Sequence, residues 1–214
     1  YFSKQNLPAD FKPKLLGEHN KEDMAAALAV GKIFGLNETS MLKTLAKFKG
    51  IPFRMELIKI WNGVKIYNDT AATSPEAGIQ AIKTLGGNLN SPIGCLILIC
   101  GGMNKKMDYT EYATAVGKNV KKVFFLEGDS TDSILQSLRA LQKNTSKVGS
   151  DSFEVKDKIM GTYNNLEKLL TDVKKVVKPG DTVLFSPAAT SFNLFQNEFD
   201  RGRQFNEAVK KVFI

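Results

Sequence analysis

The stretch Cys95-Leu96-Ile97-Leu98-Ile99-Cys100 is apolar throughout, and Gly101-Gly102 follows it directly. A short apolar run that ends at a glycine pair predicts a strand buried on both faces of a sheet. Similar runs occur at 122–126 and 182–185, and segments with helical periodicity separate them. Strands of this kind, alternating with helices, favour a mostly parallel sheet with right-handed crossovers. We therefore expect an α/β fold, a three-layer Rossmann-like domain, over this part of the chain.

Outward from this strand, the pattern predicts further elements and a domain boundary. Strands at 53–60 and 64–67 are expected to form a hairpin across Asn62-Gly63, a typical two-residue turn. Helices are expected from Ser74-Pro75-Glu76 onward, at 109–116, 132–141 and 164–177, and up to about residue 212. Before Lys49-Gly50-Ile51-Pro52 only helical patterns occur, at 22–34 and after an N-cap at Thr39 or Ser40. Residues 1–50 and 51–214 are therefore expected to form separate domains.

Composition argues against several classes of protein. The chain has 214 residues and a formal net charge of +8, but its basic residues occur in short pairs and are not interleaved with aromatic ones. This favours a solvated surface over nucleic-acid binding. No apolar run approaches the roughly 18 residues that span a membrane. The start, Tyr1-Phe2-Ser3-Lys4, has neither a signal-peptide core nor an initiator Met. We expect a cytoplasmic monomer, cut from a longer protein, with no nucleic acid or membrane among its partners.

The histidine and cysteine content limits the chemistry further. His19 is the only histidine and lies far from the predicted strand ends, which argues against a Ser/His/Asp or Cys/His arrangement and hence against a covalent hydrolase. No cluster of metal ligands is expected either. Cys95 and Cys100 lie an odd number of residues apart in one predicted strand, so they should point to opposite faces. We expect two buried, unpaired thiols in a reducing compartment.

Polar loops follow three of the predicted strands. They are Asn68-Asp69-Thr70-Ala71-Ala72-Thr73-Ser74, Gly101-Gly102-Met103-Asn104-Lys105-Lys106 and Ser186-Pro187-Ala188-Ala189-Thr190-Ser191. In a parallel sheet such loops share the edge at which ligands bind, and helix starts there offer N–H groups to a carboxylate or phosphate. Each loop can also be explained as a plain turn or N-cap. The phosphate loop Gly-x-x-x-x-Gly-Lys-Ser/Thr does not occur in the chain.

Taken in order, several segments resemble motifs of the Mur ligase family. Gly17-Glu18-His19-Asn20 is similar to a Gly-x-His-Asn segment near the end of the family's central ATP-binding domain, and 51–56 is similar to the linker that follows. The remaining four resemble motifs of the D-glutamate-adding member: 68–73 (Asn-Asp-Ser-Lys-Ala-Thr), 101–105 (Gly-Gly-x-x-Lys), 186–191 (Ser-Pro-Ala-x-Ala-Ser) and 200–205 (Arg-Gly-x-x-Phe). The resemblance implies that residues 1–50 are the end of the central domain and 51–214 the amino-acid-binding carboxy-terminal domain.

The resemblance also implies a reaction and its ligands. The whole protein would be an ATP-dependent ligase that adds D-glutamate to UDP-N-acetylmuramoyl-L-alanine through an acyl phosphate, in peptidoglycan precursor synthesis. Mg²⁺ would accompany ATP, with its ligands and the phosphate loop in a part of the family's chain that has no counterpart here. No catalytic residue is therefore assigned, and this fragment alone is expected to be inactive.

The motif matches imply roles for individual residues. Those expected at the adenine or ribose end of ATP are Asn20, Arg54 and Asp69. Those expected to hold the D-glutamate carboxylates, by charge-assisted hydrogen bonds, are Thr73, Lys105 and Ser191. Two positions depart from the family motifs: Phe53 stands where His is frequent, and Ala71 stands where the D-glutamate-adding member usually has Lys.

Two alternatives remain open on the sequence. A sister ligase, which adds another amino acid to the same precursor or is a folylpolyglutamate synthase, would share most of these motifs. A nucleotide- or anion-binding Rossmann-like module without ligase activity would also lack the phosphate loop.

Overall fold

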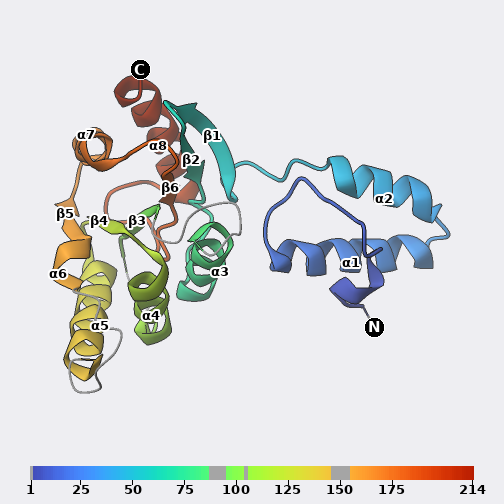
Figure 1. Ribbon diagram of the computed structural model, residues 1–214, viewed down its shortest axis with the longest axis horizontal. Coiled ribbons are helices and arrows are strands. Elements are labelled where there is room, and N and C mark those ends of the chain that lie inside the picture. Colours follow the sequence, from blue (N-terminus) through green and yellow to red (C-terminus); the bar gives the residue numbers. More distant parts are fainter. Residues whose placement is uncertain (1, 87–94, 104–105, 146–154) are drawn as a thin grey trace. The chain divides into compact units, whose positions relative to one another are not determined.

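The computed structural model describes residues 2–86, 95–103, 106–145 and 155–214, without the side chains of 143–145 and 155. The chain divides into two compact units, Tyr1–Ile51 and Pro52–Ile214. In Figure 1 the first unit is the helical one in blue, and the second is the α/β one. Among the described residues, no helix is both long enough and apolar enough to cross a membrane.

The first unit contains a short 3-10 helix, η1 (Lys4–Asn6), and two α-helices, α1 (Glu18–Ile33) and α2 (Glu38–Lys47). Its small core is formed by Leu7, Met24, Ala25 and Leu28. α1 begins earlier than the periodicity indicated, because Gly17 takes a φ of 99° and turns the chain sharply into the helix. Asn37 caps α2 by accepting a hydrogen bond from Ser40 N–H, so the prediction of Thr39 or Ser40 as the N-cap is wrong.

The second unit is built on a 6-stranded sheet with the strand order β1-β2-β6-β3-β4-β5. The strands are β1 (Glu56–Trp61), β2 (Val64–Asn68), β3 (Leu96–Gly101), β4 (Lys122–Leu126), β5 (Ile159–Tyr163) and β6 (Thr182–Phe185). β1 pairs antiparallel with β2, and every other neighbouring pair is parallel. The predicted mostly parallel α/β sheet is confirmed.

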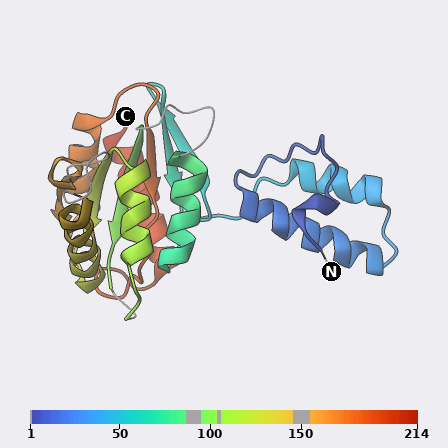
Figure 2. The same cartoon turned by 60° about the horizontal axis from the view of Figure 1, so that its bottom comes forward.

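Helices cover both faces of this sheet (Figures 1 and 2). One face carries α3 (Pro75–Gly86), α4 (Thr110–Asn119) and α5 (Asp129–Thr145), and the other carries α7 (Leu166–Val176) and α8 (Glu198–Val212). A short helix, α6 (Val155–Lys158), precedes β5. Leu98 of β3 lies in the core beneath α3–α5, whereas Ile99 lies in the core beneath α7 and α8. Successive strand residues point to opposite faces, so one apolar strand supplies both cores.

Details of the second unit also differ from the sequence predictions. β1 begins at Glu56 rather than at residue 53, because Phe53 and Met55 take positive φ values of 65° and 45° that a strand cannot contain. β5 was not predicted; its residues are alternately half-buried and exposed, as befits an edge strand. Cys95 precedes β3 and is only half-buried, so of the two cysteines Cys100 alone is fully buried.

Candidate functional site

The carboxyl ends of β2, β6 and β3 lie side by side because β6 sits between the other two strands. The loop after β6 is hydrogen-bonded to the loop on either side of it. Ala188 N–H donates to the Ala72 carbonyl at 2.9 Å, and Met103 and Thr190 exchange backbone bonds of 3.1 and 3.0 Å. We call these joined segments, residues 68–74, 101–103 and 186–191, the rim. It brings together three of the segments that resemble family motifs.

Asp69 occupies the first rim loop and is 2% exposed. Its carboxylate accepts a hydrogen bond from the Ser186 hydroxyl at 2.8 Å and another from Met55 N–H at 3.1 Å. Burial raises the pKa of Asp69 from 3.8 to about 6, since a low-dielectric interior disfavours the charged form. The two hydrogen bonds and the positive charge of Arg54 oppose this rise in pKa. One carboxylate thus ties the end of β2 to β6 and to the turn before β1.

Arg54 lies in that turn, between two residues of positive φ, Phe53 and Met55. Phe53 N–H donates to the Glu56 carboxylate at 2.9 Å, and its ring contacts the Phe199 ring with centroids 6.2 Å apart. Non-glycine residues adopt such backbone angles only where their surroundings hold them there. The turn leaves the Arg54 side chain exposed, with its charge acting on Asp69.

The three residues expected to bind carboxylates have different surroundings. Ser191 is 2% exposed, and its buried hydroxyl has no hydrogen-bond partner within the described part of the chain. Thr73 is half-buried and lies just before α3. Lys105 lies outside the described residues. A buried hydroxyl without a protein partner suits a group that meets a ligand, because leaving it unsatisfied is costly.

Two buried side chains that the sequence analysis assigned no role hold the rim together. The Arg201 guanidinium of α8 bonds Thr70 and Ala189, in two different rim loops, at 2.9–3.0 Å. The Tyr109 hydroxyl, just before α4, donates to the Ala188 carbonyl at 3.0 Å. Arg201 falls within the segment 200–205 that resembles a family motif, but the motif did not predict which residues Arg201 contacts. Tyr109 carried no comparable signal.

Asn20 belongs to the first unit, at the start of α1. Its side-chain amide donates to the Leu16 carbonyl at 2.6 Å, which closes the turn that leads into the helix. Among the described residues, no group of three or more His, Cys, Asp or Glu residues is arranged to hold a metal ion.

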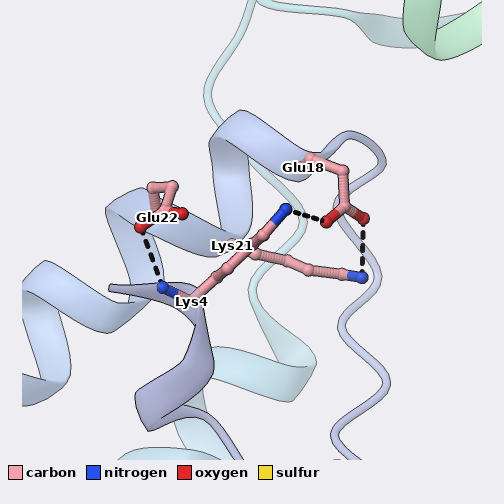
Figure 3. A network of polar contacts seen from close by, with 4 residues as sticks. All are labelled: Lys4, Glu18, Lys21 and Glu22. Atoms are coloured by element: carbon pink, nitrogen blue, oxygen red, sulfur yellow. Dashed lines mark hydrogen bonds and ion pairs between the residues drawn. The ribbon is translucent and has the colours of Figure 1, made fainter. Parts of the chain in front are cut away.

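A network of polar contacts joins Lys4, Glu18, Lys21 and Glu22 in the first unit (Figure 3). Glu18 accepts hydrogen bonds from the ammonium groups of Lys21 at 2.8 Å and Lys4 at 3.0 Å, which lower the pKa of its carboxyl to about 2. Lys4 N–H also donates to the Glu22 carboxylate at 2.8 Å. A cavity of about 460 Å³ opens here, and it is lined by Lys4, Gln5, Leu7, Pro8, Ala9, Phe11, Glu18 and Lys21. None of the expected site residues lines this cavity.

The fold and the rim define a Rossmann-like α/β domain with a polar site at the carboxyl ends of its parallel strands. The family model described as "Mur ligase, glutamate ligase domain" matches residues 53–189, from the Arg54 turn to the last rim loop. The chain belongs to the Mur ligase family.

Curated relatives extend the likeness over most of the chain. The UDP-N-acetylmuramoylalanine–D-glutamate ligase of a Roseiflexus species is 32% identical over 92% of this chain and 38% of its own length. The ligase of the same name from Aquifex aeolicus is 34% identical over 95% of this chain and 44% of its own length. The chain therefore spans about two fifths of the length of these relatives.

Solved structures show the same fold at low sequence identity. UDP-N-acetylmuramate-alanine ligase from Thermotoga maritima has a TM-score of 0.61 and is 20% identical, covering 93% of this chain and 39% of that one. The MurF ligase of the same organism, in complex with ADP, has a TM-score of 0.60 and is 22% identical, covering 92% of this chain and 40% of that one. Mycobacterium tuberculosis folylpolyglutamate synthase, complexed with ADP, has a TM-score of 0.62 and is 18% identical, covering 93% of this chain and 42% of that one. At these identities the likeness concerns the fold.

Proposed function

We propose that this chain is the carboxy-terminal part of an ATP-dependent ligase that joins D-glutamate to UDP-N-acetylmuramoyl-L-alanine in peptidoglycan precursor synthesis. The rim carries the proposal. Its three loops resemble, in order, segments of the D-glutamate-adding ligase, and they meet at the strand ends where α/β domains bind ligands. The curated relatives that bear the name of this ligase add support, with 32% and 34% identity.

At the amino-acid end we assign Thr73, Lys105 and Ser191 to the carboxylates of D-glutamate. Ser191 offers a buried hydroxyl that has no partner in the described structure. Thr73 lies beside the start of α3, whose first N–H groups and dipole favour an anion. Lys105, by its place in the Gly-Gly-x-x-Lys segment, would add a positive charge. A cation together with oriented donors suits a dicarboxylate.

At the nucleotide end we assign Asn20, Arg54 and Asp69. Arg54 is exposed, so its guanidinium can reach a bound nucleotide. Asp69 fits the role indirectly, because its buried carboxylate already accepts two hydrogen bonds and holds the turn that presents Arg54. Binding of ADP by the MurF ligase and by folylpolyglutamate synthase, which share this fold, supports nucleotide binding here.

The proposed reaction has two steps. The carboxylate of UDP-N-acetylmuramoyl-L-alanine takes the γ-phosphoryl group of ATP, giving an acyl phosphate and ADP. The D-glutamate amine then attacks the acyl carbon, inorganic phosphate leaves, and the nitrogen loses a proton. This chain's part is to hold the amino acid so that its amine meets the acyl carbon. Such positioning of two reactants accelerates their reaction. Mg²⁺ would screen the phosphate charges, and we place its ligands and the phosphate loop outside this chain.

An amino-acid panel tests the proposal. The full-length protein is incubated with ATP and UDP-N-acetylmuramoyl-L-alanine, and each of D-glutamate, L-glutamate, L-alanine and L-lysine is added in turn. We expect phosphate release and a product of the corresponding mass with D-glutamate alone. Preference for another amino acid, or for L-glutamate with a folate acceptor, would assign the chain to a sister ligase instead. Since the folds of these ligases are alike, only the substrate panel separates them.

A further inference from the structure

Arg201 is 0% exposed, although it carries a charge. Burying a guanidinium is costly unless its N–H groups are bonded or its charge is matched. None of the ion pairs among the described residues includes Arg201, and its described acceptors are neutral oxygens. Burial lowers the pKa of Arg201 to about 10, against a smaller opposing effect of Glu198, so it stays charged near neutral pH. Because burying a charged guanidinium destabilises the fold, its presence here suggests a specific role.

The acceptors of Arg201 lie on two different rim loops. Nε donates to Thr70 Oγ1 at 2.9 Å and Nη2 donates to the Thr70 carbonyl at 2.9 Å, in the loop after β2. Nη1 donates to the Ala189 carbonyl at 3.0 Å, in the loop after β6. One planar group therefore spans the gap between the two loops.

The helix that carries Arg201 is itself fastened to the first loop. The Thr70 hydroxyl donates to the Glu198 carbonyl at 3.1 Å, and the Asn68 amide donates to the Gly202 carbonyl at 3.0 Å. Gly202 leaves little space there, because a Cβ atom at this position would lie 2.6 Å from Thr70 Cγ2. The backbone of Arg201 is thus held in place against the loop after β2, and any shift of its guanidinium would move Thr70 or Ala189.

We propose that Arg201 is a positioning residue for the amino-acid site: it fixes the spacing between the loop of Thr73 and the loop of Ser191. Thr73 follows Thr70 by three residues and Ser191 follows Ala189 by two. The hydrogen bonds of Arg201 to Thr70 and Ala189, which we call the brace, therefore lie close in sequence to both site residues. A dicarboxylate must meet anchoring groups at a set separation, so use of the amino acid depends on this brace more than use of ATP does. This inference rests on the proposed function.

The shape of the side chain matters as well as its charge. Arginine presents several N–H donors in a rigid fork, whereas lysine ends in a compact point charge on a flexible stem. Lysine at this position could not bond Thr70 and Ala189 with the same geometry. Arg201→Lys therefore separates the loss of the fork from the loss of the charge, and Arg201→Met removes both.

The test measures KM for D-glutamate and for ATP separately in the full-length enzyme and in Arg201→Lys, Arg201→Met and Arg203→Met. Arg203 is the matched control, since it lies on the same helix with its side chain 60% exposed. We expect both Arg201 variants to raise KM for D-glutamate by about tenfold or more, because small misplacements of substrate groups are costly. KM for ATP should change by less than about threefold, and Arg203→Met should match the wild type.

Hydrogen–deuterium exchange of the same proteins supplies a second readout. In Arg201→Lys we expect faster exchange of the backbone N–H groups at 70–73 and 188–191, with exchange in β3 and β4 unchanged. Unchanged exchange in both loops, or equal loss of D-glutamate and ATP use, overturns the inference. If Arg201→Met fails to fold, Arg201→Lys decides by the same criteria. Failure of the wild type to use D-glutamate would instead refute the proposed function.

Discussion

The Ser186 hydroxyl donates to the Asp69 carboxylate at 2.8 Å, and this bond joins the ends of two neighbouring parallel strands, β6 and β2. Both side chains are buried, and Asp69 also accepts the Met55 N–H of the turn that carries Arg54. The contact therefore couples the loop after β6 to the turn proposed to face the nucleotide. The charge of Asp69 changes with pH, so we expect the stability of the fold to change with pH as well.

Asp69→Asn should remove a pH-dependent loss of stability. The pKa of Asp69 is about 6 in the folded protein and near 3.9 when unfolded. Well below pH 4 the carboxyl is protonated in both states and does not lower the stability of the fold. As pH rises toward 6 the unfolded state releases this proton first, so the folded state loses relative stability, by up to about 3 kcal/mol.

Urea unfolding of the wild type and Asp69→Asn between pH 3.5 and 7.5 measures this effect. The wild-type free energy of unfolding, minus that of the variant, should fall through this range and level off above pH 6 to 7. A difference that stays constant with pH would show that Asp69 titrates normally in the fold.

Gly202→Ala should destabilise the second unit. The added Cβ would lie 2.6 Å from the Phe53 ring and 2.6 Å from Thr70 Cγ2. Overpacking costs about 1–3 kcal/mol; with two groups to displace we expect the upper part of this range, which exceeds the gain of about 1 kcal/mol that alanine brings to a helix. Thermal unfolding of Gly202→Ala should therefore occur at a lower temperature than that of the wild type. The neighbouring exposed substitution Arg203→Ala is the control, and a Gly202→Ala protein more stable than both would contradict the packing described here.

A chain that begins at Pro52 should fold without the first unit. Residues from Pro52 onward contain both cores of the sheet, and enough apolar surface is buried in them for a separate domain. We expect a cooperative thermal transition for 52–214. The piece 1–51 should unfold without a sharp transition, because the core of its described residues is small and is formed by Leu7, Met24, Ala25 and Leu28. A gradual, uncooperative melt of 52–214 would mean that the boundary is misplaced.

The sequence predicted best those parts of the fold that apolar composition determines. The bounds expected for β4 and β6, 122–126 and 182–185, are the observed ones, since both strands are apolar and lie inside the sheet. β5 escaped prediction because an edge strand that is half-exposed carries no such run. The true start of β1 could not be foreseen, because the positive φ values of Phe53 and Met55 arise from tertiary contacts rather than from glycine.

The candidate site was predictable only in part, for a similar reason. Parallel strands imply that their loops share an edge, which placed Asp69 and Ser191 on the same rim. The contacts of Arg201 with Thr70 join residues 131 positions apart, so no local pattern announces them. The unsatisfied hydroxyl of Ser191 is likewise a property of its surroundings, and only coordinates reveal it.

The central claim is that Ser191 and Lys105 bind the amino acid rather than ATP, and Ser191→Ala in the full-length enzyme tests it most directly. Loss of a hydrogen bond to a charged group costs about 1.5–3 kcal/mol, or about ten- to a hundredfold in KM for D-glutamate. We expect a rise at the lower end of this range, and a larger one for Lys105→Ala, with KM for ATP little changed. Ser133→Ala, which alters a hydroxyl bonded within α5, is the control. If Ser191→Ala raised KM for ATP and left KM for D-glutamate at the wild-type value, the assignment of Ser191 to the amino acid would be wrong.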